Sequence, residues 1–204
     1  MFDCDKDHQG TAQSWDPVEA RWIDAPTLQR EGQTTSRDTV PPGVILLRPW
    51  HEDDLDRYVA LLDDPEVWQH LPEPYPDPLG RDLAAQLIAL SNSADHHLVR
   101  AAVLNGLPVG QVRLSFTPGS DDHACAEIGY WLGRDYWGKR IARDMVARFS
   151  AQCFAMMPTL HQQYARVHRD NPASRRVLER IGFVDAGPCR DHAGFDILTR
   201  QRPA

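Results

Sequence analysis

The segment from Glu127 to Phe154 constrains the fold most, because its hydrophobic pattern changes from a strand period to a helix period. Side chains at residues 127–132 alternate between two faces, which predicts a β-strand. Further along, apolar side chains recur every fourth residue, which predicts the buried face of an amphipathic helix. That face comprises Ile141, Met145, Phe149 and Cys153, widened by Ala142 and Val146.

A basic turn at residues 137–142, Trp-Gly-Lys-Arg-Ile-Ala, joins this strand to the helix. The first turn of a helix presents unpaired N–H groups and the positive end of the helix dipole, so this unit can hold a phosphate. Gly138 lets the backbone approach an anion closely, and Lys139, Arg140 and Arg143 add positive charge. On these features alone, an ordinary strand–helix connection is the alternative.

A second helix with clear start and stop signals is predicted at residues 171–183, NPASRRVLERIGF. Asn171 is a favourable N-cap, Pro172 suits the first helical position, and Gly182 suits the left-handed position after the helix. Its expected buried face is Val177, Leu178 and Ile181.

Three segments, in this order, resemble the GNAT superfamily of acetyl-CoA-dependent N-acetyltransferases. They are residues 46–72 (LLRPWHEDDLDRYVALLDDPEVWQHLP), 127–145 (EIGYWLGRDYWGKRIARDM) and 171–183. Within the superfamily the chain is similar to the branch of ribosomal-protein N-terminal acetyltransferases (Rim-type), and the similarity spans residues 44–199. The resemblance implies an α/β (α+β) mixed sheet, mostly antiparallel and flanked by helices, in the order β-α-α-β-β-β-α-β-α-β-β.

The resemblance also implies that acetyl-CoA is the cosubstrate. Its pyrophosphate is expected on residues 138–142, and its pantetheine arm along backbone groups of Tyr130 and Trp131, where the family separates this strand from its neighbour. The residues expected to contact it are Tyr130, Trp131, Leu132, Trp137, Gly138, Lys139, Arg140, Ile141, Ala142, Asn171 and Ser174.

The pyrophosphate loop departs from the family pattern, which usually runs Arg/Gln-x-x-Gly-x-Gly/Ala. Here Trp137 takes the first position, Arg140 replaces the first glycine, and Ala142 keeps the last position. An arginine at position 140 is compatible with cofactor binding if its backbone is helical. Otherwise we expect its side chain to crowd the cofactor and weaken binding.

Acetyl transfer to an amine needs a base for the amine proton and a group that holds the leaving sulfur, but no protein nucleophile. Glu127 is the candidate base, acting directly or through water, because it lies on the central strand opposite the apolar Ile128. The alternative for Glu127 is a salt-bridged strand residue. By resemblance, Ser174 is the candidate for hydrogen-bonding the cofactor sulfur, and a plain capping serine is the alternative.

The proline-rich loop at residues 72–78 is expected to border the acceptor cleft, by the same resemblance. Trp68, Leu71 and Tyr75 are therefore candidates for the substrate wall, with ordinary packing as the alternative for Trp68. The connection between the last two strands, residues 187–194, is short where relatives often carry a longer loop near the substrate.

The remaining elements follow from periodicity and turn signals. The Asn105-Gly106 pair predicts a hairpin between strands at 97–103 and 109–116. Leu83, Leu87 and Leu90 mark the expected face of a helix at 79–90. Further strands are expected at 44–48, 123–132, 164–167, 184–186 and 195–198. A helix is expected at 51–62 and another turn of helix at 66–70.

Composition narrows the classes of function. The net charge of −7 argues against nucleic acid as a partner. The cysteines and histidines lack metal-ligand spacing, so no metal is expected. The chain has no apolar run of membrane-spanning length and no signal at its start, so we expect a cytoplasmic protein that does not engage a membrane.

Two parts are expected: an N-terminal extension at residues 1–43 and an acetyltransferase domain at 44–204. The extension is expected to be mostly disordered, and a short docking helix through Trp15, Val18, Trp22 and Ile23 is the alternative. The expected activity is acetyl transfer from acetyl-CoA directly to a primary amine, either a protein or peptide N-terminus or a small-molecule amine. The alternative is a low-activity acyl-CoA-binding module with a regulatory or assembly role. The sequence leaves a homodimer open.

Overall fold

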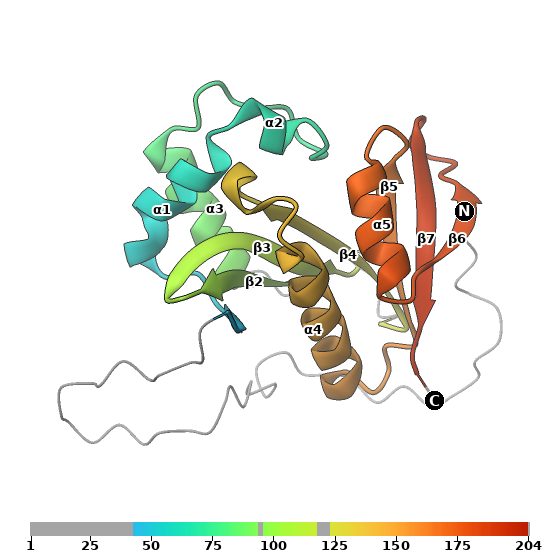
Figure 1. Cartoon of the computed structure of the whole chain (residues 1–204). Coiled ribbons are helices and arrows are strands. Elements are labelled where there is room, and N and C mark those ends of the chain that lie inside the picture. The colour runs from blue at the N-terminus through green and yellow to red at the C-terminus, as the bar shows by residue number, and fades with distance from the viewer. Residues whose placement is uncertain (1–42, 94–95, 118–122, 204) are drawn as a thin grey trace, which may run out of the picture.

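A computed structural model describes residues 43–93, 96–117 and 123–203, in which seven strands form one sheet with helices on both faces (Figure 1). The strand order is β1-β2-β3-β4-β5-β7-β6. β4 and β5 run parallel, and every other neighbouring pair is antiparallel. The strands are β1 (Ile45–Arg48), β2 (His97–Leu104), β3 (Leu107–Ser115), β4 (Cys125–Leu132), β5 (Gln162–His168), β6 (Val184–Pro188) and β7 (Phe195–Gln201).

The helices follow the predicted order, so the mixed and mostly antiparallel α/β fold is confirmed. Residues 1–42, which make up nearly all of the predicted N-terminal extension, and residues 118–122 lie outside the described residues. The α-helices are α1 (Leu55–Leu62), α2 (Pro65–Trp68), α3 (Arg81–Ser93), α4 (Ile141–Met156) and α5 (Pro172–Arg180), and the 3₁₀ turns are η1 (Glu52–Asp54) and η2 (Arg134–Tyr136).

The hairpin between β2 and β3 forms at the predicted dipeptide. Asn105 and Gly106 both have positive φ, at 52° and 81°. These are the angles of the two-residue turn whose twist matches that of the flanking strands, and asparagine followed by glycine tolerates them best. The turn places Leu104 opposite Leu107 at the end of the β2–β3 pair, and the other edge of β3 pairs with β4.

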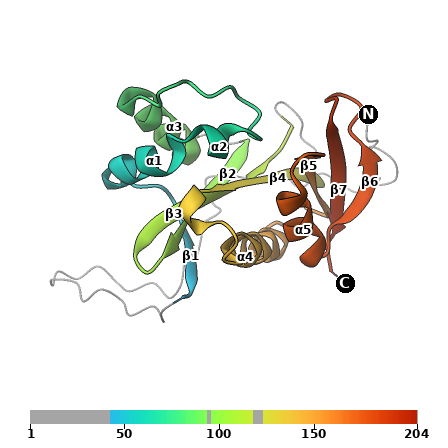
Figure 2. The same cartoon turned by 45° about the horizontal axis from the view of Figure 1, so that its top comes forward.

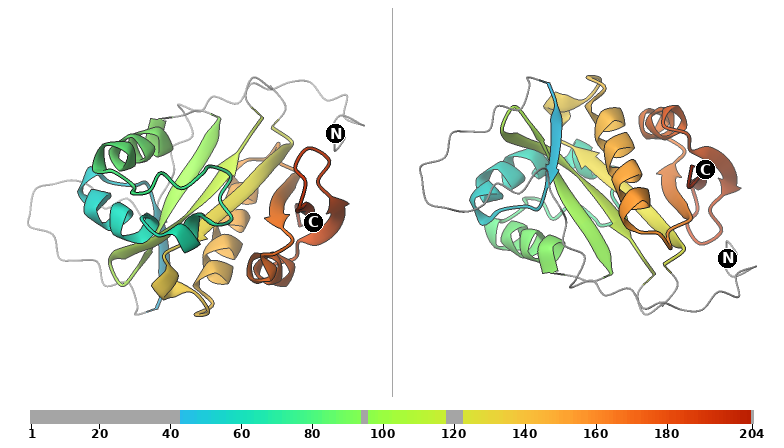
Figure 3. Two further views of the ribbon diagram at one scale, coloured as in Figure 1. Left: turned by 90° about the horizontal axis from the view of Figure 1, so that it is seen from above. Right: turned by 90° about the horizontal axis from the view of Figure 1, so that it is seen from below.

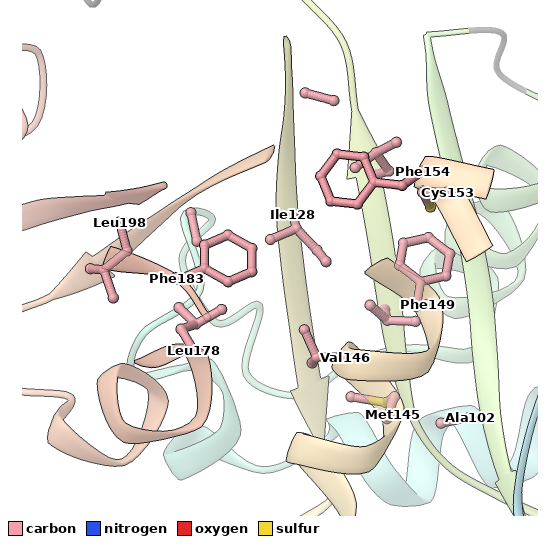
Figure 4. Close-up of a cluster of buried hydrophobic side chains, with 14 of the residues drawn as sticks. Ala102, Ile128, Met145, Val146, Phe149, Cys153, Phe154, Leu178, Phe183 and Leu198 are labelled. Atoms are coloured by element: carbon pink, nitrogen blue, oxygen red, sulfur yellow. The ribbon is translucent and has the colours of Figure 1, made fainter. Parts of the chain in front are cut away.

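The two faces of the sheet carry separate hydrophobic cores. Helices α1, α2 and α3 cover one face and α4 covers the other (Figure 3). Under α4, the predicted stripe of Ile141, Met145, Phe149 and Cys153 is buried in the same core as Ile128 of β4, which confirms the helix period. Figure 4 shows Met145, Phe149, Cys153 and Ile128 in this core. The opposite core centres on Trp50, Tyr58 and Trp131.

The predicted buried face of α3 is wrong for Leu83 and Leu90, whereas Leu87 is partly buried against the core as predicted. Leu83 and Leu90 are 38% and 52% exposed, whereas Ala84 and Ile88 are 0% and 4% exposed. The buried stripe is therefore offset by one residue from the leucines, and it uses a small alanine where α3 packs beside α1 and β2. The prediction from the leucine spacing failed for Leu83 and Leu90 because the size of a side chain alone does not decide which side of a helix packs against the core.

Candidate functional site

The candidate site begins where β4 and β5 separate. Their parallel pairing starts at Cys125 opposite Gln162 and ends at Glu127 opposite Tyr164, although β4 continues to Leu132. On its other edge, β4 stays paired with β3 as far as Leu132. Backbone groups of residues 128–132 that point toward β5 therefore have no strand partner within the described chain. They can hydrogen-bond an extended ligand.

The loop before α4 presents a row of free N–H groups. Within the described residues, the N–H groups from Gly138 to Arg143 have no backbone partner, and the first such bond is Asp144 N–H to Arg140 O, at 3.2 Å. Gly138 has φ of 72°. The start of a 16-residue helix adds its positive dipole end, so this loop has the geometry of an anion-binding site.

Cationic side chains surround this loop. Lys139 and Arg140 are exposed, and Arg143 pairs with Asp144 at 2.8 Å. The Lys139 ammonium also lies over the Tyr136 ring, 5.8 Å from its centroid. The predicted pyrophosphate loop, residues 138–142, thus combines unpaired donors with positive charge, and a diphosphate fits both features.

An arginine at position 140 was expected to be compatible with cofactor binding if its backbone were helical. The backbone of Arg140 is not helical. Its φ of 65° and ψ of −1° are left-handed, a conformation that costs a non-glycine residue about 1–2 kcal/mol. The position retains the backbone that a glycine would favour, although the residue is an arginine. Its side chain caps nothing and is exposed.

Three predicted contacts can reach the opening only through their backbone. The Trp131 side chain lies in the opposite core, stacked on Trp50 with ring centroids 6.2 Å apart. The side chains of Leu132 and Ile141 are also buried. Trp137 differs, because it is 45% exposed and its indole N–H donates to the Leu132 carbonyl at 2.8 Å.

Tyr130 and Ser174 meet at the start of α5, which lies beside α4 on the same side of the sheet (Figure 2). The Tyr130 hydroxyl and Ser174 Oγ are 2.9 Å apart. Ser174 N–H donates to Asn171 Oδ1 at 3.0 Å, so Asn171 caps the helix as predicted. Burial raises the pKa of Tyr130 to about 12, so its hydroxyl stays protonated well above neutral pH.

This role of the Tyr130 side chain was not predicted from the sequence, where only its backbone groups were expected to contact the cofactor. The signal was present in the alternation of β4. Tyr130 points away from the face that carries Trp131, and thus toward the core on which α4 and α5 pack.

Glu127 lies on the face of β4 that carries Trp131 and is paired with Arg166 of β5. Arg166 Nε donates to Oε1 at 2.8 Å and Nη2 donates to Oε2 at 2.7 Å. This pair bridges the two strands where their backbone pairing ends. The Glu127 side chain is 16% exposed, and the Arg166 guanidinium also contacts His192. The structure therefore shows the salt bridge that was the alternative for Glu127. Each carboxylate oxygen still keeps a second lone pair that can accept another hydrogen bond.

The three predicted substrate residues gather around one open groove of about 390 Å³, which Trp68, Leu71 and Tyr75 line with Glu73 and neighbouring prolines. Trp68 is mostly buried and donates to the Leu62 carbonyl at 2.5 Å, so its packing role is clear. The Tyr75 hydroxyl donates to Asp63 at 2.6 Å, which raises the pKa of Tyr75 to about 12.

The segment that lines the groove also contacts β5, on the face of the sheet that carries Glu127. The rings of His70 and His168 stack with centroids 5.6 Å apart. Burial, and then the neighbouring His168, lower the pKa of His70. His168 shares its strand face with Arg166, two residues away. The predicted residues therefore fall into two groups: the loop, Tyr130 and Ser174 on one side of β4, and Glu127 and the groove on the other.

Two further features bear on function. Among the described residues, no cluster of histidine, cysteine, aspartate or glutamate could hold a metal ion. None of the described helices is both long and apolar enough to cross a membrane.

Comparison with known proteins gives a consistent result. Residues 45–184 match the family model of the acetyltransferase (GNAT) domain. The "uncharacterized N-acetyltransferase p20" of Bacillus licheniformis is 26% identical over 152 residues, which are 72% of this chain and 83% of that protein.

Two solved structures share the fold. One is RimJ of Mycobacterium smegmatis in complex with CoA-disulfide, with a TM-score of 0.68 and 22% identity over 78% of this chain and 82% of that one. The other is spermidine N-acetyltransferase of Vibrio cholerae in complex with CoA and spermine, with a TM-score of 0.65 and 19% identity over 78% of this chain and 95% of that one. At these identities, the likeness concerns the fold alone.

Proposed function

The chain belongs to the GNAT acetyltransferase family, and we propose that it transfers the acetyl group of acetyl-CoA directly to a primary amine, with a peptide or protein N-terminus as the favoured acceptor. Acetyl-CoA is the cosubstrate, as in the family, and supplies an activated thioester. The observation that carries the proposal is the end of β4–β5 pairing at Glu127. There a loop of free N–H groups lies beyond one end of the opening, and a carboxylate lies beside it.

On the cofactor side, the loop before α4 and the unpaired edge of β4 support the proposal. The N–H groups of residues 138–143 would hold the pyrophosphate, and the free edge of residues 128–132 would hold the pantetheine arm. The protonated Tyr130 would donate its hydroxyl proton to Ser174 Oγ, and Ser174 would donate its own to the sulfur as the carbon–sulfur bond breaks. Asn171 would contribute by holding the N-terminal turn of α5, where Ser174 lies.

The acceptor side uses Glu127 as the base. Arg166 occupies one lone pair on each carboxylate oxygen, which fixes the side chain and leaves the other lone pairs for a water molecule or the amine. Glu127 would then accept, directly or through that water, the proton that the amine loses as it bonds to the acetyl carbon.

The groove supports a peptide as acceptor, since it is open and lined by prolines and aromatic rings rather than by a row of acids. The Rim-type branch is proposed on the same ground, together with the motifs in the sequence. A small-molecule amine is the competing acceptor within the same chemistry.

The first experiment is thermal unfolding with and without acetyl-CoA, followed by mass spectrometry of a panel of N-terminal peptides and small amines. A cosubstrate at 100 times its Kd should stabilise the protein by about 2.7 kcal/mol. Binding without acetylation of any amine would instead support a low-activity acyl-CoA-binding module, for which the left-handed Arg140 is the structural argument.

Glu127→Gln tests the base. We expect kcat to fall about 100-fold while the shift caused by acetyl-CoA is retained. Asp185→Asn is the matched control, because it also removes a carboxylate from an arginine, Arg175, but on the distant strand β6. Equal kcat in Glu127→Gln and the wild type, or a kcat that does not vary with pH, would rule out this role.

A further inference from the structure

We propose that the acceptor carries a carboxylate a few bonds away from its amine and that Arg113 of β3 binds this carboxylate. The proposal starts from the charges on the face of the sheet that carries Glu127 and the groove. The inference rests on the proposed function and names the class of acceptor. Its chemistry is shared by free amino acids and by peptides that begin with an acidic residue.

Arg113 lies on the same face of the sheet as Glu127. The β3–β4 register places Gln111 opposite Trp131, Arg113 opposite Gly129 and Ser115 opposite Glu127. Opposite residues of an antiparallel pair share a face, and Trp131 fixes which face this is, because its side chain packs with Trp50 on the α1 side.

Gly129 makes the room that Arg113 occupies. A Cβ atom at position 129 would lie 3.0 Å from Arg113 Nε and 3.5 Å from its Cγ. The arginine side chain therefore lies across β4 toward the β5 side, where the strand pairing has ended. This is the side from which an acceptor would approach the opening.

Arg113 is partly buried and has no hydrogen-bond or ion-pair partner among the described residues. Other partly buried arginines of the domain have one: Arg48 pairs with Asp54, and Arg166 with Glu127. Since Arg166 already donates one hydrogen bond to each Glu127 oxygen, the charge of Glu127 is paired with Arg166 and does not neutralise Arg113. Together, the charged groups Arg113, Arg166 and Glu127 carry one net positive charge on this face of the sheet.

A guanidinium with five donors and no partner is suited to a carboxylate, which it can bind through two parallel hydrogen bonds. Arg113 and Glu127 are diagonal neighbours, with backbones about 7–8 Å apart, so one small group can reach both. An amine held beside Glu127 would place a carboxylate a few bonds away within reach of Arg113. A polyamine would instead bring a second positive charge to the same spot.

The test measures binding and turnover with matched acceptors on the full chain. Binding is measured by calorimetry on protein saturated with CoA, so that it does not depend on catalysis, and turnover is measured with acetyl-CoA. One pair is the peptide amide Asp-Ala-Ala against Asn-Ala-Ala. The other pair is alanine against ethylamine, and spermine serves as the cationic acceptor.

We expect the carboxylate member of at least one pair to be favoured about 10- to 100-fold in Kd and kcat/KM, the range for a hydrogen bond to a charged group. A preference confined to the peptide pair identifies an acidic N-terminus as the source, and one confined to alanine identifies a free amino acid. Equal values in both pairs, or a preference for spermine, would overturn the proposal.

Arg113→Gln should remove the preference by weakening only the carboxylate member, whereas Arg113→Lys should retain part of it. Arg148→Gln is the control, because Arg148 is an exposed arginine on α4, over the other face of the sheet. A loss that is equal for both members of a pair would mark Arg113 as merely structural. The thermal shift caused by acetyl-CoA should persist in Arg113→Gln. Its absence in the wild type would refute the proposed function instead.

Discussion

Arg140 shows how a single residue can keep a backbone shape that its side chain does not favour. It occupies a left-handed position directly before α4, where the family pattern has glycine. Substitution by glycine removes the steric cost but adds flexibility to the unfolded chain, so the net effect is smaller than the strain itself.

We therefore expect Arg140→Gly to raise the free energy of unfolding by about 0.5–1 kcal/mol, measured by urea denaturation. Arg148→Gly is the matched control, because it makes the same exchange at an exposed position inside α4 and should lower stability by about 1 kcal/mol. Destabilisation by both variants would show that position 140 does not need a left-handed residue.

Tyr130 gives a prediction in alkaline solution. Burial raises its pKa from 10 to about 12, so the folded protein keeps a proton that the unfolded chain releases above pH 10. Stability should therefore be unaffected by this group below pH 10 and should fall between pH 10 and 12.

The measurement is urea denaturation of the wild type and Tyr130→Phe at pH 8 and pH 11. The phenylalanine variant lacks this titration, so it should lose less stability between the two pH values, by about 1 kcal/mol for one pH unit. Parallel losses in the two proteins would show that Tyr130 titrates normally in the folded state.

At the scale of elements, the close approach of β3 and β4 depends on Gly110. A Cβ at this position would lie 2.3 Å from the Trp131 carbonyl oxygen and 2.9 Å from the Leu132 Cα. Both atoms belong to the backbone of β4, which cannot move without disturbing the strand edge proposed to bind the cofactor.

Gly110→Ala should therefore lower the free energy of unfolding by about 3 kcal/mol and weaken acetyl-CoA binding, as measured by thermal unfolding with the ligand. Gly80→Ala is the control, since a Cβ there meets nothing within 4 Å. A neutral Gly110→Ala would mean that the strands separate at little cost.

Local patterns predicted the elements well and their long-range partners less well. The Asn105-Gly106 turn, the α4 stripe and the Asn171 cap follow from neighbouring residues alone, and all three are present. The Glu127–Arg166 pair joins residues that are 39 positions apart in the sequence and lie on two strands that separate, so no spacing in the sequence predicts it. The unpartnered Arg113 and the Tyr130–Ser174 contact likewise depend on tertiary register.

At the scale of the whole molecule, the described fold begins at β1, and its first residue, Ile45, is 5% exposed in the core beneath α4. We therefore expect the fragment 44–204 to fold and to bind acetyl-CoA as the full chain does. Its unfolding midpoint should lie within about 2 °C of the full chain, since a shift of 1 kcal/mol corresponds to about 2–4 °C at this size.

The fragment 50–204 is the control, because it lacks β1 and uncovers the β2 edge as well as the core. It should unfold at a clearly lower temperature. If the fragment 44–204 loses acetyl-CoA binding while its midpoint is unchanged, residues 1–43 contribute to the site.

The early end of β4–β5 pairing has a consequence for how fast amide protons exchange with solvent. β4 lies in the middle of a seven-stranded sheet, where amides are usually the slowest to exchange. In residues 128–132, however, the amides that point away from β3 have no strand partner in the described chain. They should exchange quickly in the free protein beside slow neighbours on the same strand. A bound cosubstrate would make the central strand slow along its whole length.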